Sequence, residues 1–351
     1  MTINRSLGLL FVSFVFFCSP LLFVGNPGNP AYPQLKTAGA VPDISIIGDS
    51  RAHVGMAPRQ LLAELTDQGV PGLTAQNFAV DGTDVLHHWS FASSALLSGP
   101  RRPRVLIWAA NPLQFDDSRR NNRLEYLKLA DALPLLRMRA PLELVLDVVT
   151  MGLFRPWARR PLFKTFVSDY SERLGIRTLP LQTRVMGLTY EQEELSRTYT
   201  DRGDGWVPFK VLQWKDRFHR GALGYEREYA GLKLGSWHFA LVRDFARRCA
   251  RNGVKLIVVE TPVSPWFQSH LALLPVHQEW RRRMADELEK EGALFLNHAA
   301  LMEEAGDEAF GDPGHMPEDL ALRYTKRLGG VLLDGGALGL APAQTALTGE
   351  L

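Results

Sequence analysis

The strongest constraint on the fold is an alternation of short apolar runs with helix-like segments. Five runs rich in β-branched or aromatic residues, each of a length typical of a buried strand, lie at 43–48, 73–80, 103–111, 254–260 and 293–297. Helix-like segments follow at 57–68, 84–98, 225–252, 277–291 and 317–333. The alternation predicts an α/β fold in which helices cover a parallel sheet of about five strands.

Residues 112–224 interrupt this alternation. They contain helix-like stretches and then the basic, aromatic run RPWARRPLFKTF at 155–166. We interpret the segment as a helical insertion that packs on the core as a lid or subdomain, or that forms a surface for a membrane or a membrane partner. The main domain is expected over 43–333, with a flexible C-terminal tail at 334–351.

The N-terminus carries a membrane-targeting segment. Residues 6–25 contain no charged residue and follow the single cation Arg5. A signal-peptide core has about 7–15 apolar residues and a spanning helix about 17–25, so the length favours a signal anchor within 1–25 over a cleaved signal peptide. Arg5 favours export of the body. We expect a membrane-anchored protein with its body outside the cytoplasm, secreted if the segment is cleaved, and a linker over 26–42 rich in Pro, Gly and Asn.

Several classes of protein are disfavoured. The formal net charge of +2 and the absence of a long block of like charge give no sign of a nucleic-acid partner. Cys18 lies in the apolar segment, which leaves Cys249 as the only thiol of the body and excludes an internal disulfide framework. The sequence has no glycine-rich phosphate loop and no histidine pair with metal-ligand spacing, so we expect no cofactor and no metal. His53 is interpreted as a surface residue at a helix start, with a place in the pocket as the alternative.

Candidate catalytic residues follow the predicted strands. Ser50, in the stretch GDSR, lies just after the first strand, where open parallel sheets bind ligands. The tripeptide alone is also typical of a turn and a helix cap. A serine hydroxyl becomes a nucleophile only when a base removes its proton and a third group orients that base. Asp312 and His315, three positions apart in a turn before the last helix, supply these two groups.

Hydrogen-bond donors for a developing oxyanion are expected after the second and third strands. Gly82 lets a backbone N–H approach a ligand closely, and Asn111 has an amide that can donate. The N–H of Ser50 is the third donor, at a helix N-terminus. Asp49 is expected to bond backbone groups of its turn or to contact substrate, and Arg51 is a candidate to hold an anionic substrate group.

These motifs resemble the four blocks of the SGNH (GDSL) hydrolases: Gly48-Asp49-Ser50, Gly82, Asn111 and Asp312-x-x-His315. The resemblance covers 43–111 and 225–333, and it implies a flavodoxin-like α/β/α sandwich. It also implies that Ser50 is the nucleophile, His315 the base and Asp312 its orienter, with an oxyanion hole formed by Ser50, Gly82 and Asn111. The third block departs from the family pattern Gly-x-Asn-Asp, because here it reads Ala-Ala-Asn-Pro at 109–112.

The stretch GDSR behind a membrane segment, and DPGHM before the last helix, look closest to membrane-tethered SGNH proteins of alginate acetylation and teichoic-acid D-alanylation. This similarity implies an acyltransferase or esterase acting on acyl esters, with acetyl favoured, of a cell-envelope glycan. Its partners would be an acyl-ester donor, a glycan acceptor and a membrane-bound O-acyltransferase. The alternative is a non-catalytic SGNH-fold partner of that membrane enzyme, which binds carbohydrate or organises a complex.

Overall fold

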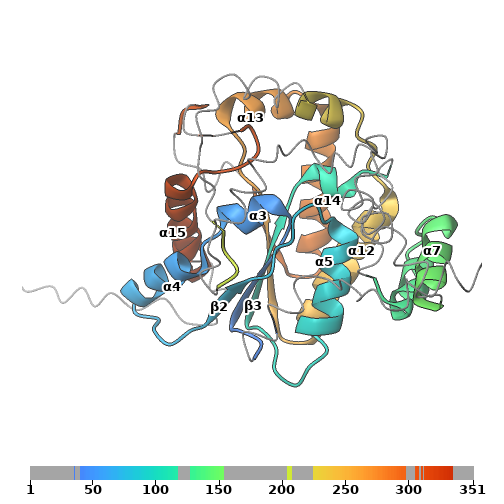
Figure 1. Cartoon of the computed structure of the whole chain (residues 1–351), viewed down its shortest axis with the longest axis horizontal. Helices are drawn as coiled ribbons and strands as arrows, with labels where there is room; N and C mark the ends of the chain where they lie inside the picture. The colour runs from blue at the N-terminus through green and yellow to red at the C-terminus, as the bar shows by residue number, and fades with distance from the viewer. Residues whose placement is uncertain are drawn as a thin grey trace, which may run out of the picture. The chain divides into compact units, whose positions relative to one another are not determined.

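The computed structural model describes residues 35, 40–117, 127–153, 204–207, 224–297, 305–307, 310 and 312–334. The chain divides into a unit formed by 30–121 and 199–351, which contains the sheet, and a unit formed by 1–29 and 122–198. Figure 1 shows the described elements. Within the described ranges, no helix combines the length and the apolar character that a membrane crossing needs. The predicted membrane segment at 6–25 and the tail from 335 onward lie outside these ranges.

The first unit is built on a five-stranded parallel sheet, which confirms the predicted α/β fold. Its strands are β1 (Ile44–Ile47), β2 (Ala75–Asn77), β3 (Val105–Ala110), β4 (Lys255–Glu260) and β5 (Leu294–Leu296). Their order in the sheet is β2-β1-β3-β4-β5, and every neighbouring pair is parallel. The order reverses at β1, because β2 lies on one side of it and all later strands lie on the other. Open parallel sheets bind ligands beyond the carboxyl ends of their strands at such a reversal.

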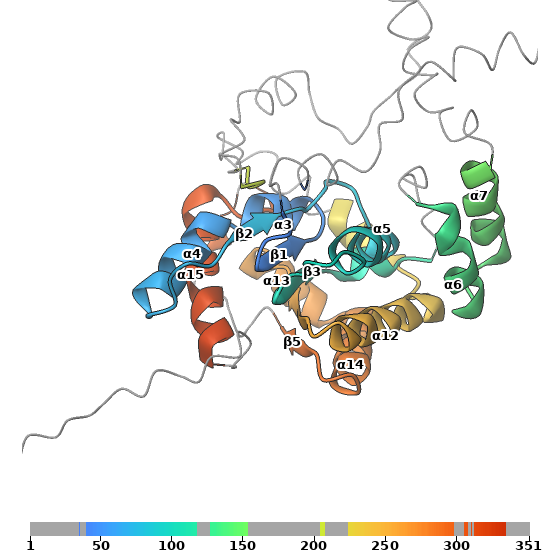
Figure 2. The same ribbon diagram turned by 90° about the horizontal axis from the view of Figure 1, so that it is seen from below.

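Helices cover both faces of the sheet (Figure 2). On one face, α4 (Pro58–Asp67) and α15 (Glu318–Asp334) pack on strand residues such as Ile46 and Ile107. On the other face lie α5 (Val85–Phe91), α12 (Ser236–Arg251) and α14 (Pro275–Glu289), where the Trp108 ring lies 5.5 Å from that of Phe245. Ile107 and Trp108 are neighbours with opposite orientations, as the alternation of side chains along a strand requires.

Four predicted helices appear within a few residues of their expected bounds: α4, α5 with its π-helical continuation at Ala92–Leu96, α14 and α15. The single helix predicted over 225–252 is wrong in its extent. A helical stretch covers 224–230, and α12 begins only at Ser236. The chain between them pairs with a distant loop, since Leu234 forms an isolated bridge with Asp116.

A helix N-terminus was expected at Ser50, and the structure shows there the short α3 (Ser50–Gly55), which follows β1 directly. A further helix, α13 (Pro265–Ala272), was not predicted from the sequence. The side chain of Ser264 caps it by accepting a hydrogen bond from Phe267 N at 3.3 Å. A serine cap followed by proline at the first helical position is a recognisable start signal. The sequence therefore contained the information for α13.

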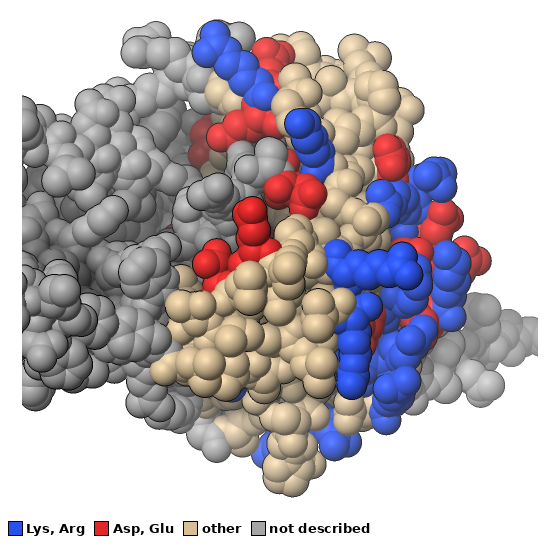
Figure 3. Space-filling model, turned by 90° about the vertical axis from the view of Figure 1, so that its right-hand side faces the viewer, with Lys and Arg blue, Asp and Glu red and all other residues tan. Residues whose placement is uncertain are grey.

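Part of the predicted insertion is described, and its stretch at 127–153 is largely helical. It contains a 3₁₀ turn (Leu129–Asp131), α6 (Ala132–Arg137) and α7 (Leu142–Leu153). Val148 of α7 is buried, whereas Leu133, Leu146 and Leu153 are more than half exposed. The side of the molecule drawn in Figure 3 shows a broad area without charged residues and, along another part, interleaved basic and acidic side chains. The basic run at 155–166 lies outside the described residues.

Candidate active site

The corner between β1 and α3 holds Ser50 in a fixed position. Gly48 is required there by close packing, because a Cβ atom at this position would lie 2.6 Å from the Cβ of Ala52. Asp49 caps α3, and its Oδ1 accepts a hydrogen bond from Arg51 N at 3.0 Å. Of the two roles predicted for Asp49, the structure shows the contact with the backbone of its own turn. Ser50 is the first residue of the helix.

The structure brings Ser50, His315 and Asp312 into one hydrogen-bonded chain. The Oγ atom of Ser50 lies 2.9 Å from His315 Nε2, and His315 Nδ1 lies 2.8 Å from Asp312 Oδ2. The other oxygen of Asp312 accepts from the backbone N–H groups of Gly314 and His315 at 2.7 and 2.9 Å. A carboxylate that accepts a hydrogen bond from Nδ1–H leaves Nε2 with a lone pair that faces the hydroxyl. This is the orientation in which an imidazole can take a proton from a serine.

The electrostatics of the pair favour an ionised carboxylate. Burial raises the pKa of Asp312, but the His315 ring and the N–H of Gly314 outweigh this effect and hold the pKa below its usual value. Burial lowers the pKa of His315, but the charge and hydrogen bond of Asp312 outweigh it and raise that pKa above 6.5. His315 is therefore a stronger base than an ordinary histidine, and it accepts a proton readily.

Arg51 is buried beside this chain. Only 6% of the residue is exposed, its Nη1 donates to the Tyr229 hydroxyl at 3.3 Å, and its guanidinium lies 5.5 Å from the centre of the Tyr225 ring. Its positive charge helps to lower the pKa of Asp312. The structure thus shows Arg51 packed between α3 and the helical stretch at 224–230. Its contact with an anionic substrate group stays a prediction.

Asn111, at the end of β3, is oriented by Asp49. The amide Nδ2 donates to Asp49 Oδ2 at 2.6 Å, and the amide oxygen accepts from Leu113 N at 3.1 Å. Gln114 donates to the same Asp49 oxygen at 2.9 Å. An amide nitrogen carries two N–H groups, and the bond to Asp49 uses one of them. Gln114 was not predicted, because it lies 65 positions beyond Asp49, in a turn that only the pairing of β3 with β1 brings close.

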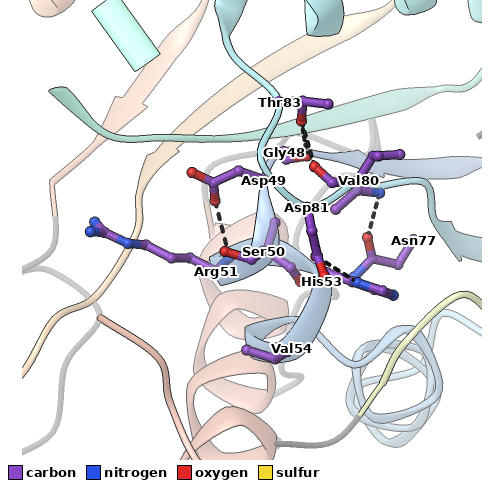
Figure 4. Close-up of polar contacts among 12 residues, drawn as sticks. Gly48, Asp49, Ser50, Arg51, His53, Val54, Asn77, Val80, Asp81 and Thr83 are labelled. Carbon is purple, nitrogen blue, oxygen red and sulfur yellow. Dashed lines mark hydrogen bonds and ion pairs between the residues drawn. The ribbon is translucent and has the colours of Figure 1, made fainter. Parts of the chain in front are cut away.

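Gly82 lies in the turn after β2 with a positive φ of 68°, a conformation that glycine adopts at low cost. Thr83 braces this turn by donating to the carbonyl of Val80 at 2.5 Å, with the carbonyl of Gly48 at 3.3 Å (Figure 4). The three predicted oxyanion donors therefore follow three adjacent strands, β2, β1 and β3, at the same edge of the sheet. That they bind an oxyanion stays a prediction.

The adjacent histidines of α5, His87 and His88, both form hydrogen bonds within the fold. His88 accepts from Trp108 Nε1 at 3.0 Å through Nδ1, and its Nε2 lies 2.9 Å from Thr83 Oγ1. Burial lowers the pKa of His88 to about 4, so the ring is neutral at pH 7. His87 pairs with Asp84, the cap of the same helix, at 2.7 Å. Both side chains support the turn after β2.

A second imidazole–carboxylate pair has its histidine on the same helix as Ser50. His53 Nδ1 is 2.9 Å from Asp81 Oδ1, and the His53 side chain is 21% exposed (Figure 4). The sequence alone did not indicate this pair, because 28 positions separate the two residues and only the pairing of β1 with β2 brings them together. His53 lies near the site as well as near the surface, which were the two alternatives considered for it.

In the described part of the chain, no group of three or more His, Cys, Asp or Glu side chains is arranged to hold a metal ion. Comparisons of the chain with protein-family models, with characterised proteins and with solved structures give no match.

Proposed function

We propose that this protein is an SGNH-type serine enzyme that carries an acyl group on Ser50. The observation that supports this proposal best is the continuous chain Ser50–His315–Asp312, with contacts of 2.9 and 2.8 Å, at the ligand-binding edge of the sheet. The strand order 2-1-3-4-5 is also that of flavodoxin-like sandwiches. A hydroxyl, an oriented imidazole and an ionised carboxylate are the parts that acyl transfer by serine requires.

In the first half of the reaction, Ser50 Oγ attacks the carbonyl carbon of an ester while His315 Nε2 takes the hydroxyl proton. The tetrahedral oxyanion accepts hydrogen bonds from the N–H groups of Ser50 and Gly82 and from the amide of Asn111. His315 then donates its proton to the departing alcohol oxygen, which leaves an ester on Ser50. Asp312 stays ionised and stabilises the imidazolium throughout.

In the second half, a hydroxyl group attacks the acyl-serine. Its proton passes to His315 and from there to Ser50 Oγ, which restores the free serine. When the attacking hydroxyl belongs to a glycan the reaction is a transfer, and when it belongs to water the reaction is hydrolysis. We propose the acyl group to be acetyl and the glycan to be a polymer of the cell envelope, reached by a body anchored through residues 6–25 and served by a membrane-bound O-acyltransferase.

The proposal is tested by labelling the detergent-solubilised full-length chain with a fluorophosphonate probe and by measuring turnover of p-nitrophenyl acetate. We expect wild type to label and turn over, and Ser50→Ala to lose both while keeping its circular dichroism spectrum. Ser98→Ala is the control, because Ser98 is an exposed serine whose hydroxyl bonds a backbone carbonyl. A folded wild type that neither labels nor turns over would contradict the proposal and favour a non-catalytic binding partner.

A further inference from the structure

We propose that His53 and Asp81 form a subsite that binds a glycan hydroxyl next to the reacting ester. The inference rests on the proposed function and names a specificity residue for it. His53 follows Ser50 by three positions in α3, and side chains with this spacing lie on the same face of a helix, about 5–6 Å apart at their Cβ atoms. Figure 4 shows both residues on this helix, with Asp81 beside them.

The position of Asp81 connects the pair with the expected oxyanion site. Asp81 directly precedes Gly82 in the turn after β2, and its carboxylate holds His53 Nδ1 at 2.9 Å. The pair therefore lies beside the place where the carbonyl oxygen of an ester is expected to bind. The pair is built as the Asp312–His315 pair is built, with a carboxylate on Nδ1 that fixes the orientation of the ring.

The chemistry of the exposed nitrogen determines what the pair can bind. In the tautomer whose Nδ1–H donates to the carboxylate, Nε2 carries a lone pair and can accept a hydrogen bond. Among the described residues, no hydrogen bond engages His53 Nε2, and the ring is 21% exposed, whereas His87, His88 and His277 are nearly fully buried. An acceptor at the edge of an ester site recognises an O–H donor, and sugar hydroxyls are the O–H donors that surround an ester on a glycan.

The experiment compares two acetate esters of similar size with the full-length chain in detergent. Methyl 6-O-acetyl-β-D-glucopyranoside carries hydroxyls next to the ester, and cyclohexylmethyl acetate carries none. We expect His53→Gln to lower kcat/KM for the sugar ester about tenfold, which is the loss typical of one hydrogen bond, and to change it less than twofold for the cyclohexyl ester. Asp81→Ala should act in the same direction and more weakly, because the ring remains but loses its orientation.

The matched control is His270→Gln, since His270 is also a partly exposed histidine with a carboxylate partner, Glu226 at 3.4 Å. This variant should leave kcat/KM unchanged for both esters. Fluorophosphonate labelling of Ser50 at the wild-type rate in His53→Gln shows that α3 is folded. Equal losses on both esters, no loss on either, or a wild type without preference for the sugar ester would overturn the subsite alone. A wild type that does not label would overturn the proposed function and the subsite together.

Discussion

Two carboxylates at the carboxyl-end edge of the sheet each hold a histidine, Glu260 in a buried pair and Asp312 in a partly exposed one, and only the second pair has the arrangement of a catalytic base. At the end of β4, Glu260 Oε1 lies 2.8 Å from His277 Nε2, a contact as short as that between Asp312 and His315. The side chains of Glu260 and His277 are 4% and 0% exposed, whereas those of Asp312 and His315 are 20% and 18% exposed. Both pairs therefore share a short carboxylate–imidazole contact, and they differ in how exposed their side chains are.

The two pairs also differ in the third group that each one contacts. Arg281 donates to both oxygens of Glu260, at 2.7 and 3.1 Å, and its charge joins the hydrogen bond of His277 in lowering the Glu260 pKa against the effect of burial. In the other pair the third partner is the neutral hydroxyl of Ser50. The second ring nitrogen of His277 is buried without a hydrogen-bond partner among the described residues. The far ring nitrogen of His315 reaches a hydroxyl, whereas that of His277 reaches no described partner, so only His315 is placed to exchange a proton with a neighbouring group.

The largest expected effect comes from changing the Asp312–His315 pair, which the proposed mechanism uses as its base. Asp312→Asn removes the charge that stabilises the imidazolium and favours the wrong ring tautomer, so we expect kcat/KM for p-nitrophenyl acetate to fall about 10³–10⁴-fold. Asp319→Asn, at an exposed carboxylate of the following helix, is the control and should keep full activity. A loss below tenfold for Asp312→Asn would show that the pair is not used as a base.

The second prediction concerns the Glu260–His277 pair at the end of β4. Arg281→Ala leaves the buried charge of Glu260 with only His277 as partner, so we expect the free energy of unfolding to fall by about 3 kcal/mol in urea denaturation. Labelling of Ser50 in the folded variant should stay at the wild-type rate. Arg282→Ala, which removes an exposed ion pair with Asp286 from the same helix, should cost less than about 1 kcal/mol. Equal losses of unfolding free energy for Arg281→Ala and Arg282→Ala would contradict the view that burial makes the Glu260 pair costly to break.

A third prediction concerns the side chains that support the proposed oxyanion site. Gln114→Leu removes one of the two amide donors that hold Asp49 Oδ2, so Asn111 loses part of its orientation. We expect kcat to fall about tenfold, or about 1.4 kcal/mol, with KM nearly unchanged. Gln278→Leu is the control, because its amide bonds only an exposed backbone carbonyl. A change confined to KM would indicate that Gln114 contacts substrate instead.

The smallest expected effect is on the pH profile. Because the pKa of His315 is raised, kcat/KM should increase along a limb that lies above pH 6.5. The stability that this raised pKa contributes is fully present below 6.5 and is lost as pH rises through the folded-state value, so activity and this part of stability change in opposite directions. Arg51 lowers the His315 pKa, so Arg51→Met should move the limb to higher pH, and Arg59→Met should not. A limb centred at or below pH 6.5 would contradict the stated electrostatics.

The sequence predicted the parts that depend on local pattern. Apolar runs located all five strands, and the motifs around Ser50 and His315 located the two halves of the hydrogen-bonded chain. Contacts that depend on which elements become neighbours were not predictable: Gln114 with Asp49, and His53 with Asp81. The break between 224–230 and α12 was missed for the same reason, because Leu234 leaves the helix to pair with a residue 118 positions earlier. A helical pattern in the sequence cannot show that a distant loop competes for the backbone.

Ser50 and His315 are separated by 265 positions, and α15, which follows His315, ties the start of α4 in place through Thr325, whose hydroxyl accepts from Ala57 N at 3.1 Å. At about 5–20 residues per second, a ribosome needs tens of seconds to make the chain between them. During that interval Ser50 lacks His315, the base that the proposed mechanism assigns to it. Under the proposed function, a protein exported as it is made would become chemically active only on the far side of the membrane, after its last helix has arrived.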